Sequence, residues 1–292
     1  MRIGFIGLGK MGAPMAKNLA DAGYNVLGFD IAKVLIKGVS IVKNIKSVAE
    51  NMDVIITMLP NGELLQEVYA QIIPIAKENS VLIDCSTVDI KSALNASSLA
   101  KANNIWSMDA PVSGGVVGAE SGMLTFMVGG NTKAFETVTP LFEVMGQKAV
   151  FCGDNGSGQA AKICNNMILG ISMIAVCEGF ALADQLKLDR QKMFDVASTS
   201  SGQCWSLNTY CPVPGVGPKS PSDNGYEPGF STDLMLKDLS LAQSAAKSGN
   251  VHTPLGEHAQ KIFSDFYNKN GQGKDFSAVI NFLKEINVKP GK

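Results

Sequence analysis

Histidine is scarce in this 292-residue chain, which has only His252 and His258. Six cysteines are present, but no two form a Cys-x-x-Cys pair, so we expect no zinc site and no other bound metal. Scattered cysteines in a chain this long are typical of reduced, mostly buried thiols. Both histidines lie late in the chain, far from any glycine-rich turn, so we expect neither to be a catalytic acid or base.

Charge of one sign is also lacking, because the net charge is -1 and neither half carries a basic run. Nucleic acid and membranes are therefore not expected as partners. The apolar, uncharged stretch at residues 163–177 is shorter than the roughly 20 residues of a membrane span, and we expect a helix there that is surrounded by protein. The chain begins directly on an apolar run, which predicts no signal or transit segment.

The first half alternates short apolar runs with helical patterns, in a composition that is 46% hydrophobic and 17% charged. Helical periodicity occurs, for example, at 13–22 and 63–70. Strand–helix alternation predicts an α/β Rossmann domain with a mostly parallel, doubly wound sheet. The predicted strands are 2–6, 26–29, 54–58, 81–84, 106–109, 124–128 and 149–151.

The pattern changes at the glycine-rich turn 153–158, after which we predict no strand. Residues 159–187 are expected to form one long helix, followed by further helices at 189–199, 232–248, 254–268 and 277–285. We therefore predict a dinucleotide-binding domain at 1–158 and an all-helical substrate and oligomerisation domain at 159–292. Residues 202–229, rich in Pro and Gly, are predicted to be a long functional loop.

A Gly-x-Gly-x-x-Gly motif stands between the first strand and the first helix. Gly7 permits the tight turn, Gly9 lets the backbone approach a pyrophosphate, and Gly12 lets helix and strand pack closely. The helix N-terminus then offers N–H groups to the phosphates. The motif predicts a cofactor site made of Gly7, Leu8, Gly9, Lys10, Met11 and Gly12.

Asp30 ends the second predicted strand, where ribose-binding carboxylates belong. A carboxylate accepts hydrogen bonds from ribose hydroxyls and repels a 2′-phosphate, so NAD is favoured over NADP. The alternative is that Asp30 only caps the next segment.

Lys162 and Asn166 lie one turn apart on one face of the long predicted helix. A lysine in an apolar helix, near its positive end and a nicotinium charge, is expected to have a lowered pKa. Such a lysine suits general acid/base chemistry near neutral pH, and Asn166 could orient a substrate hydroxyl. A lysine that extends to solvent and an asparagine that caps locally explain the pattern equally well.

Ser113, Gly114 and Gly115 follow another predicted strand. Successive glycines expose backbone N–H groups that can hold a carboxylate, with the Ser113 hydroxyl assisting. An ordinary turn is the alternative. Lys237-Asp238 lies on a later helix, and by itself this pair is typical of a solvated face.

Taken together, the motifs of this chain resemble the β-hydroxyacid dehydrogenase family over essentially its whole length. The motifs that carry the resemblance are residues 4–19, 58–60, 84–87, 109–115, 158–166 and 237–239. The resemblance implies a Rossmann domain joined by a long helix to a helical domain, and a homodimer or homotetramer. It implies catalytic roles for Lys162, Asn166 and Ser113. It further implies that Ser113, Gly114, Gly115, Lys162, Asn166, Trp205 and Lys237 bind substrate, and that Leu59, Pro60, Leu64, Thr87 and Lys237 complete the NAD site. Relatives often carry a polar contact where this chain has Leu64, so a side-chain hydrogen bond is not expected there.

Residues 202–216, with Trp205 and Tyr210, resemble the 3-hydroxyisobutyrate dehydrogenase branch of that family. This resemblance implies NAD-dependent oxidation of 3-hydroxyisobutyrate in valine catabolism. A sister activity, tartronate or succinic semialdehyde reductase, and a non-catalytic NAD-binding sensor stay open as alternatives. We expect a bacterial cytoplasmic enzyme, or a mitochondrial matrix enzyme if the chain is a matured eukaryotic one.

Overall fold

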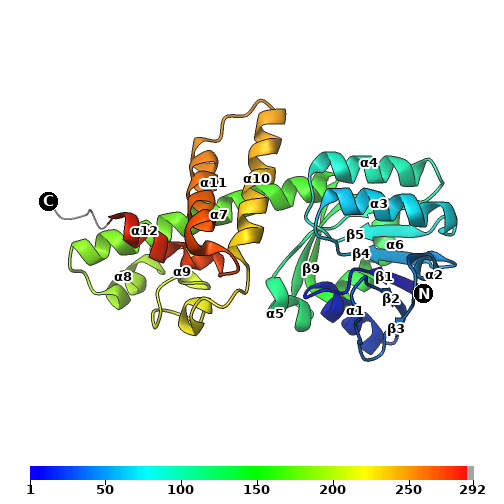
Figure 1. Ribbon diagram of the computed structural model, residues 1–292, viewed down its shortest axis with the longest axis horizontal. Helices are drawn as coiled ribbons and strands as arrows, with labels where there is room; N and C mark the ends of the chain where they lie inside the picture. The colour runs from blue at the N-terminus through cyan, green and yellow to red at the C-terminus, as the bar shows by residue number, and fades with distance from the viewer. Residues whose placement is uncertain (288–292) are drawn as a thin grey trace. The chain divides into compact units, whose positions relative to one another are not determined.

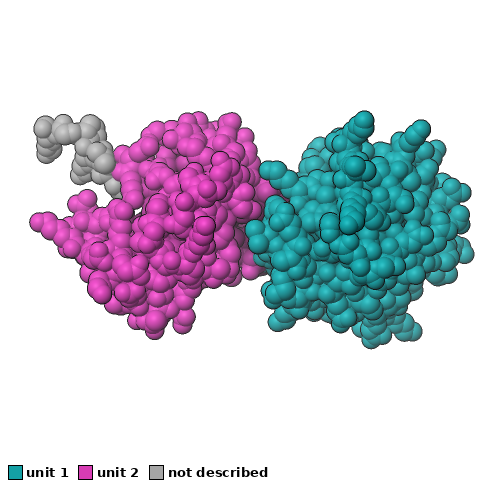
Figure 2. Space-filling model, turned by 90° about the horizontal axis from the view of Figure 1, so that it is seen from below, with its two compact units in different colours: residues 1–162 teal, residues 163–292 magenta. Residues whose placement is uncertain are grey.

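The computed structural model describes residues 1–287, so the last five residues of the predicted helical domain lie outside the described part. The chain divides into two compact units, Met1–Lys162 and Ile163–Lys292, which Figure 2 shows in different colours. The division falls inside the long helix α7 (Ser157–Gln185), near the predicted boundary at 158/159.

The first unit is built around one nine-stranded sheet (Figure 1). Its strand order is β3-β2-β1-β4-β5-β6-β8-β7, and β9 pairs with β8. The strands from β3 to β6 along this order are parallel, whereas β8 runs antiparallel to β6 and β7. The strands are β1 (Arg2–Ile6), β2 (Asn25–Phe29), β3 (Ser40–Ile41), β4 (Val54–Thr57), β5 (Val81–Asp84), β6 (Trp106–Asp109), β7 (Val112–Ser113), β8 (Leu124–Gly130) and β9 (Gly146–Gly153).

Helices cover both faces of this sheet because its strands are apolar on both sides. On one face, Ile3 and Phe5 of β1 pack in a core with Leu19 and Phe142. On the other face, Ile55 of β4 packs in a separate core with residues of α2, α3 and α4. The helices are α1 (Gly12–Asp21), α2 (Ile45–Ala49), α3 (Gly62–Ile72), α4 (Ile90–Lys101), α5 (Gly115–Glu120) and α6 (Thr132–Met145).

The second unit is helical, and its described residues contain no strand. Met173, Cys177 and Phe180 of α7 form its core together with residues from α10, α11 and the segment before α12. Its helices are the rest of α7, α8 (Arg190–Ala197), α9 (Trp205–Asn208), α10 (Thr232–Ser248), α11 (Pro254–Phe266) and α12 (Val279–Asn287). The prediction of a Rossmann domain followed by an all-α domain is confirmed.

Three details of the prediction are corrected by the structure. The strands β3 and β7 were not predicted, because two residues are too few to show an alternating pattern. The predicted loop 202–229 contains α9 and a 3₁₀ turn at Pro221–Asn224. Helix α7 is not surrounded by protein on every side, since Ile168 and Leu182 are 62% and 60% exposed.

By length and composition alone, α7 could cross a membrane, and 39% of its most apolar window is buried inside the chain. The core helix of a globular domain can have the same length and composition. The buried side of α7 packs on the core of the second unit, so lipid could not surround it.

Candidate active site

The glycine turn of the first unit has a geometry that only glycine permits. Gly7 has φ +90°, and a Cβ at this position would lie 2.2 Å from the Met58 carbonyl oxygen. A Cβ on Gly12 would lie 1.9 Å from the Gly7 carbonyl oxygen. These contacts pack β1, the turn and α1 more closely than any side chain would allow.

The same turn leaves room for a phosphate. A Cβ on Gly9 would meet nothing within 4 Å, and no side chain caps the first turn of α1. The N-terminus of α1 therefore presents backbone N–H groups toward open space, as a pyrophosphate requires. The residues present fit a bound dinucleotide. Lys10 is exposed beside Gly9, while Leu8 is buried.

Asp30 joins the end of β2 to this turn. Its Oδ2 accepts a hydrogen bond from the Leu8 N–H at 2.6 Å, and its Oδ1 accepts one from the Ala32 N–H at 2.7 Å. Each carboxylate oxygen can accept a second bond, so both stay available to ribose hydroxyls. Asp30 thus caps the next segment, as the alternative interpretation held, and also fixes the glycine turn.

The carboxyl ends of β4 and β5 are tied together by a network that was missed in the sequence. The Leu59 N–H donates to Ser86 Oγ at 2.7 Å, and Ser86 Oγ donates to Asp84 Oδ1 at 2.6 Å. Burial raises the pKa of Asp84 to about 7, against the opposing effect of hydrogen bonds from Ser86 and Thr57. Because Asp84 fixes Ser86, it also sets the backbone on either side, at Leu59-Pro60 and at Thr87. Leu64, in the first turn of α3, is 37% exposed, and its N–H donates to the cap residue Asn61.

Asp109, at the end of β6, holds the start of α7. Its two carboxylate oxygens accept from the N–H groups of Gly156 at 2.7 Å and Gln159 at 2.8 Å. Burial raises the pKa of Asp109 to about 6, and these backbone bonds oppose the rise. The Gln159 side chain extends the clamp, because it donates to the Ser86 carbonyl and accepts from the Val88 N–H. The first turn of α7, which leads to Lys162, is therefore fixed to two strand ends. A buried aspartate two residues before a proline gave no sequence signal for this role.

Lys162 is buried, and its Nζ donates to the Val112 carbonyl oxygen at 2.7 Å. Val112 belongs to β7, which continues directly into Ser113, Gly114 and Gly115. Both glycines have positive φ, +134° and +63°, and α5 begins at Gly115 without a side-chain cap. The structure thus links the predicted acid/base to the segment predicted to hold a carboxylate.

Asn166 is the first predicted site residue of the second unit, one turn after Lys162 along α7. Its amide donates to Asp238 Oδ2 at 2.5 Å, and its Oδ1 accepts from the Asn165 side chain at 2.9 Å. Asp238 is 3% exposed, which corrects the interpretation of the Lys237-Asp238 pair as a solvated face. Lys237 Nζ lies 3.6 Å from Asp238 Oδ1. An ionised carboxylate can only accept, so Asp238 fixes which end of the Asn166 amide faces it.

Trp205 lies at the start of α9, half exposed, and stacks on Tyr210 with 4.7 Å between ring centroids. The Tyr210 hydroxyl donates to Asp275 Oδ2 at 2.8 Å. The indole is therefore backed by a second, hydrogen-bonded ring, which restricts its motion.

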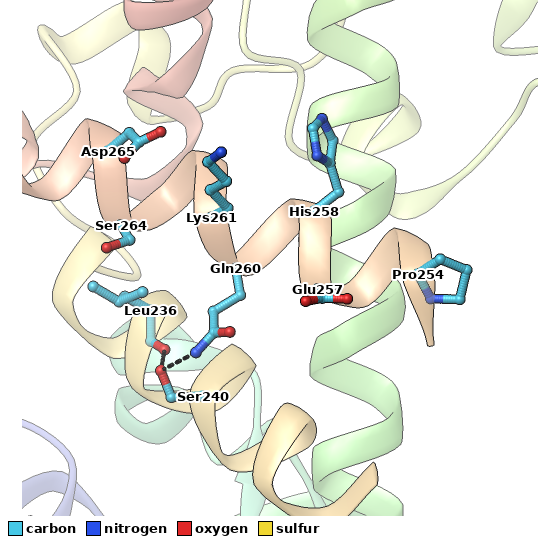
Figure 3. A pocket seen from close by; sticks show the side chains of 9 residues that line it. All are labelled: Leu236, Ser240, Pro254, Glu257, His258, Gln260, Lys261, Ser264 and Asp265. Atoms are coloured by element: carbon cyan, nitrogen blue, oxygen red, sulfur yellow. Dashed lines mark hydrogen bonds between the residues drawn. The ribbon is translucent and has the colours of Figure 1, made fainter. Parts of the chain in front are cut away.

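A separate groove of about 620 Å³ lies between α10 and α11 (Figure 3). His258 and Glu257 line it, and the bond from Gln260 to Ser240 crosses it at 3.0 Å. None of the predicted site residues lines this groove. Among residues 1–287, no group of three His, Cys, Asp or Glu side chains could hold a metal.

Two family models match the chain in succession. Residues 2–153 match the NAD binding domain of 6-phosphogluconate dehydrogenase, and residues 156–283 match the model described as NAD-binding of NADP-dependent 3-hydroxyisobutyrate dehydrogenase. Fold, glycine turn and family models together define a dehydrogenase that binds NAD as its cofactor.

Similar proteins narrow this class. The chain is 43% identical to the probable 3-hydroxyisobutyrate dehydrogenase of Mycobacterium tuberculosis over 97% of each chain. It is 45% identical to the mitochondrial 3-hydroxyisobutyrate dehydrogenase of Bos taurus, over 97% of this chain and 87% of that protein. A solved M. tuberculosis 3-hydroxyisobutyrate dehydrogenase with L-serine superposes with a TM-score of 0.93 at 43% identity, covering 97% of this chain and 99% of that one. The chain belongs to the 3-hydroxyisobutyrate dehydrogenase family, as its motifs predicted.

Proposed function

We propose that the protein oxidises 3-hydroxyisobutyrate reversibly to methylmalonate semialdehyde with NAD. The observation that carries the proposal is the polar, buried face of α7, where Lys162 and Asn166 stand one turn apart in a mostly apolar helix. The names of the 43–45% identical relatives support the substrate. A non-catalytic NAD sensor would have no need for this buried pair.

In this proposal each residue has one task. The backbone N–H groups at Gly114 and Gly115, with the Ser113 hydroxyl, hold the substrate carboxylate. Asn166 hydrogen-bonds the substrate hydroxyl, and Lys162 Nζ takes the hydroxyl proton. NAD held at the glycine turn would supply the acceptor for the hydride that leaves carbon 3. Most of the acceleration would come from this prior positioning, since the clamp at Asp109 already fixes the first turn of α7.

The remaining cofactor and substrate contacts complete the proposal. The turn from Gly7 to Gly12 receives the pyrophosphate, and Asp30 binds the adenosine ribose and disfavours NADP. Residues Leu59, Pro60, Leu64 and Thr87 line the cofactor, Lys237 reaches cofactor or substrate, and Trp205 contacts the methyl-bearing carbon of the substrate. The apolar indole face, backed by Tyr210, favours this substrate over glycerate.

A substrate panel tests the proposal directly. Purified protein is given 3-hydroxyisobutyrate, glycerate, 4-hydroxybutyrate and L-serine, each with NAD and with NADP, and the absorbance of the reduced cofactor is followed. We expect the highest kcat/KM for 3-hydroxyisobutyrate with NAD. A higher value for glycerate or 4-hydroxybutyrate would replace this function with a sister activity, and no oxidation of any acid would favour the NAD sensor.

We further propose that the enzyme works in valine catabolism as a homo-oligomer. Similar proteins occur in mycobacteria and, by name, in mitochondria. We propose that the enzyme works in the bacterial cytoplasm, with the mitochondrial matrix as the alternative. Cell fractionation followed by the NAD-linked assay distinguishes the two locations.

A further inference from the structure

Trp205 is a large side chain on a very short helix of the second unit. It is 50% exposed, and α9 is only four residues long. No side chain in the described part of the chain caps the first turn of α9. A helix this short is not stable by itself, so its backbone alone cannot fix the direction of the indole. Contacts from outside α9 must therefore hold Trp205 in place.

Tyr210 supplies these contacts. Its ring stacks on the Trp205 indole with 22° between the ring planes, and it also packs on Phe276 of the core at 5.4 Å between centroids. Its hydroxyl donates to Asp275 Oδ2 at 2.8 Å. Burial raises the pKa of Tyr210 well above its usual value, and the Asp275 carboxylate raises it further, so the phenol stays protonated and donates. The ring that supports the indole is therefore attached at its polar end to Asp275.

Asp275 is fully buried and has no freedom to turn. Besides the tyrosine hydroxyl, its Oδ2 accepts from the N–H groups of Gly229 at 3.1 Å and Phe230 at 3.0 Å. Its Oδ1 accepts from the Ser277 N–H at 3.0 Å and from the Ser277 hydroxyl at 2.6 Å. A carboxylate offers about four lone-pair positions, and these donors occupy all of them. The acceptor that Tyr210 uses is thus fixed from three separate segments of the chain.

Gly229 leaves the space that this hydrogen bond needs. A Cβ at position 229 would lie 2.6 Å from the Tyr210 hydroxyl oxygen, which is closer than side chains approach one another. Any other residue there would push the hydroxyl away from the Asp275 carboxylate. The bond between Tyr210 and Asp275 therefore depends on the loop before α10 as well as on the two partners themselves.

A buried carboxylate is not required to stabilise a fold. Removing a charge from water costs free energy, and apolar side chains of similar volume often pack equally well. What a charged acceptor adds is direction, because hydrogen bonds to it are shorter and stronger than bonds between neutral groups. The direction fixed by Asp275 is that of the Tyr210 ring, and through this ring that of the Trp205 indole.

We propose that Asp275 is a positioning residue, which holds the Trp205 indole through Tyr210 in the orientation that contacts the methyl group of the substrate. The contact with substrate rests on the proposed function, whereas the link from Asp275 to Trp205 does not. A side chain that is ordered before binding loses less conformational freedom when the ligand arrives. The link therefore acts on the affinity for a methyl-bearing substrate and leaves the chemical step unchanged.

Fluorescence of Trp205 tests the link without substrate. The chain has two tryptophans, so Trp106→Phe leaves Trp205 as the single reporter, and this variant is the parent for all others. Tyr210→Phe keeps the stacked ring and removes its bond to Asp275. We expect lower steady-state anisotropy and stronger acrylamide quenching of Trp205 than in the parent. Unchanged anisotropy and quenching in Tyr210→Phe would overturn the link.

Ser277→Ala is the matched control, because it removes a bond to the other oxygen of the same buried carboxylate. It should lower the unfolding temperature about as much as Tyr210→Phe does and leave the Trp205 signals at their parent values. Equal changes of anisotropy in the two variants would show that Asp275 stabilises the fold alone, and would overturn the proposal.

Asp275→Asn tests whether the carboxylate is the source of the effect. The amide makes the bond with Tyr210 neutral and weaker, so the anisotropy should lie between those of the parent and of Tyr210→Phe. Combining the two substitutions should give no further loss, because residues in one network are not additive. An additive loss would overturn the path through Tyr210. If Asp275→Asn does not fold, Tyr210→Phe and Ser277→Ala decide alone, since both keep the carboxylate.

Steady-state kinetics test the consequence for the substrate. Tyr210→Phe should raise the KM for 3-hydroxyisobutyrate about 3- to 5-fold, the size of effect expected from one hydrogen bond, with kcat nearly unchanged. The KM for glycerate, which has a hydroxyl in place of the methyl group, should change less, and Ser277→Ala should change neither. A lower kcat with unchanged KM would overturn the specificity role. A wild-type preference for glycerate would instead refute the proposed function and its methyl contact, while the anisotropy results would still decide the link.

Discussion

The two units present their proposed ligand-binding groups by different means. In the first unit these proposed groups are mainly backbone: the turn at Gly7–Gly12, with no side chain capping α1, and the segment Ser113–Gly115. In the second unit they are side chains, since Asn166 is held by Asp238 and Trp205 by Tyr210. We call these sets the backbone half and the side-chain half. Backbone sites need glycine at particular positions, so they can be recognised as motifs in the sequence. Side-chain sites need no such motif and are harder to recognise.

The largest effect on kcat is expected from substitution of Lys162, the last residue of the first unit. Lys162→Ala removes the group proposed to take the proton, and general acid/base catalysis contributes typically about 10²–10⁴-fold. We therefore expect kcat to fall by at least about 10²-fold. NAD affinity, measured by titration calorimetry, should change little, because the glycine turn and Asp30 stay intact.

Lys17→Ala is the matched control, since Lys17 is exposed on α1 and pairs with Asp21 in the same helix. This variant should keep wild-type kcat. Near-normal turnover in Lys162→Ala would show that the lysine serves structure alone, through its bond to Val112.

The side-chain half is expected to respond next. Asp238→Ala leaves the buried Asn166 amide without the acceptor that orients it. Hydrogen bonds to charged groups are worth about 1.5–3 kcal/mol, and since part of this is regained when the amide turns, we expect kcat to fall about 10-fold. Asp238→Asn keeps an acceptor oxygen and should recover most of the loss. Equal kcat values for the Ala and Asn variants would argue against orientation of Asn166.

Lys162 and Asp238 also show how much of the site could be predicted from the sequence. The Rossmann domain, the helical domain and the glycine turn could be predicted, because alternating strands and helices and obligatory glycines leave local patterns. Lys162 and Asn166 could be paired because they are one turn apart. The side chains that position this part of α7 could not, since Asp109 lies 50 residues from Gln159 and Asp238 lies 72 residues from Asn166. Asp238 next to Lys237 looked like a solvated pair, and only tertiary packing buries it.

A smaller effect on kcat is expected from Asp109, which accepts hydrogen bonds from the backbone at the start of α7. Asp109→Asn places an amide N–H₂ against one of the two N–H groups at the start of α7. Losing one such bond costs about 1 kcal/mol, so we expect about a 5-fold lower kcat. Asn44, which caps the short and remote helix α2, supplies the control as Asn44→Ala, and kcat should not change.

The same group predicts a pH dependence. Burial raises the pKa of Asp109 to about 6, so below that pH a proton occupies an oxygen that should accept from the backbone. Wild-type kcat should therefore decline below pH 6, and the decline should be weaker in Asp109→Asn. Stability should behave oppositely. Because the folded pKa lies above the ordinary value of 3.8, folding favours the protonated form, and this group's contribution to the unfolding free energy rises as pH falls from about 6 toward 4. A kcat profile unchanged by the substitution would remove Asp109 from the positioning of α7.

The smallest effect concerns the choice between NAD and NADP, which we assign to Asp30, a side chain bonded to the glycine turn of the backbone half. Asp30 holds the turn through the Leu8 N–H and is proposed to bind the ribose, so Asp30→Ala should weaken the binding of both NAD and NADP. The ratio of the two dissociation constants isolates the ribose role, because the loss of the turn contact affects both cofactors alike. Asp30 is partly exposed, which limits its effect, so we expect the preference for NAD to fall about 3-fold, or about 0.7 kcal/mol. If both affinities fall and their ratio stays constant, Asp30 only fixes the turn, and discrimination between the cofactors must come from elsewhere in the backbone half.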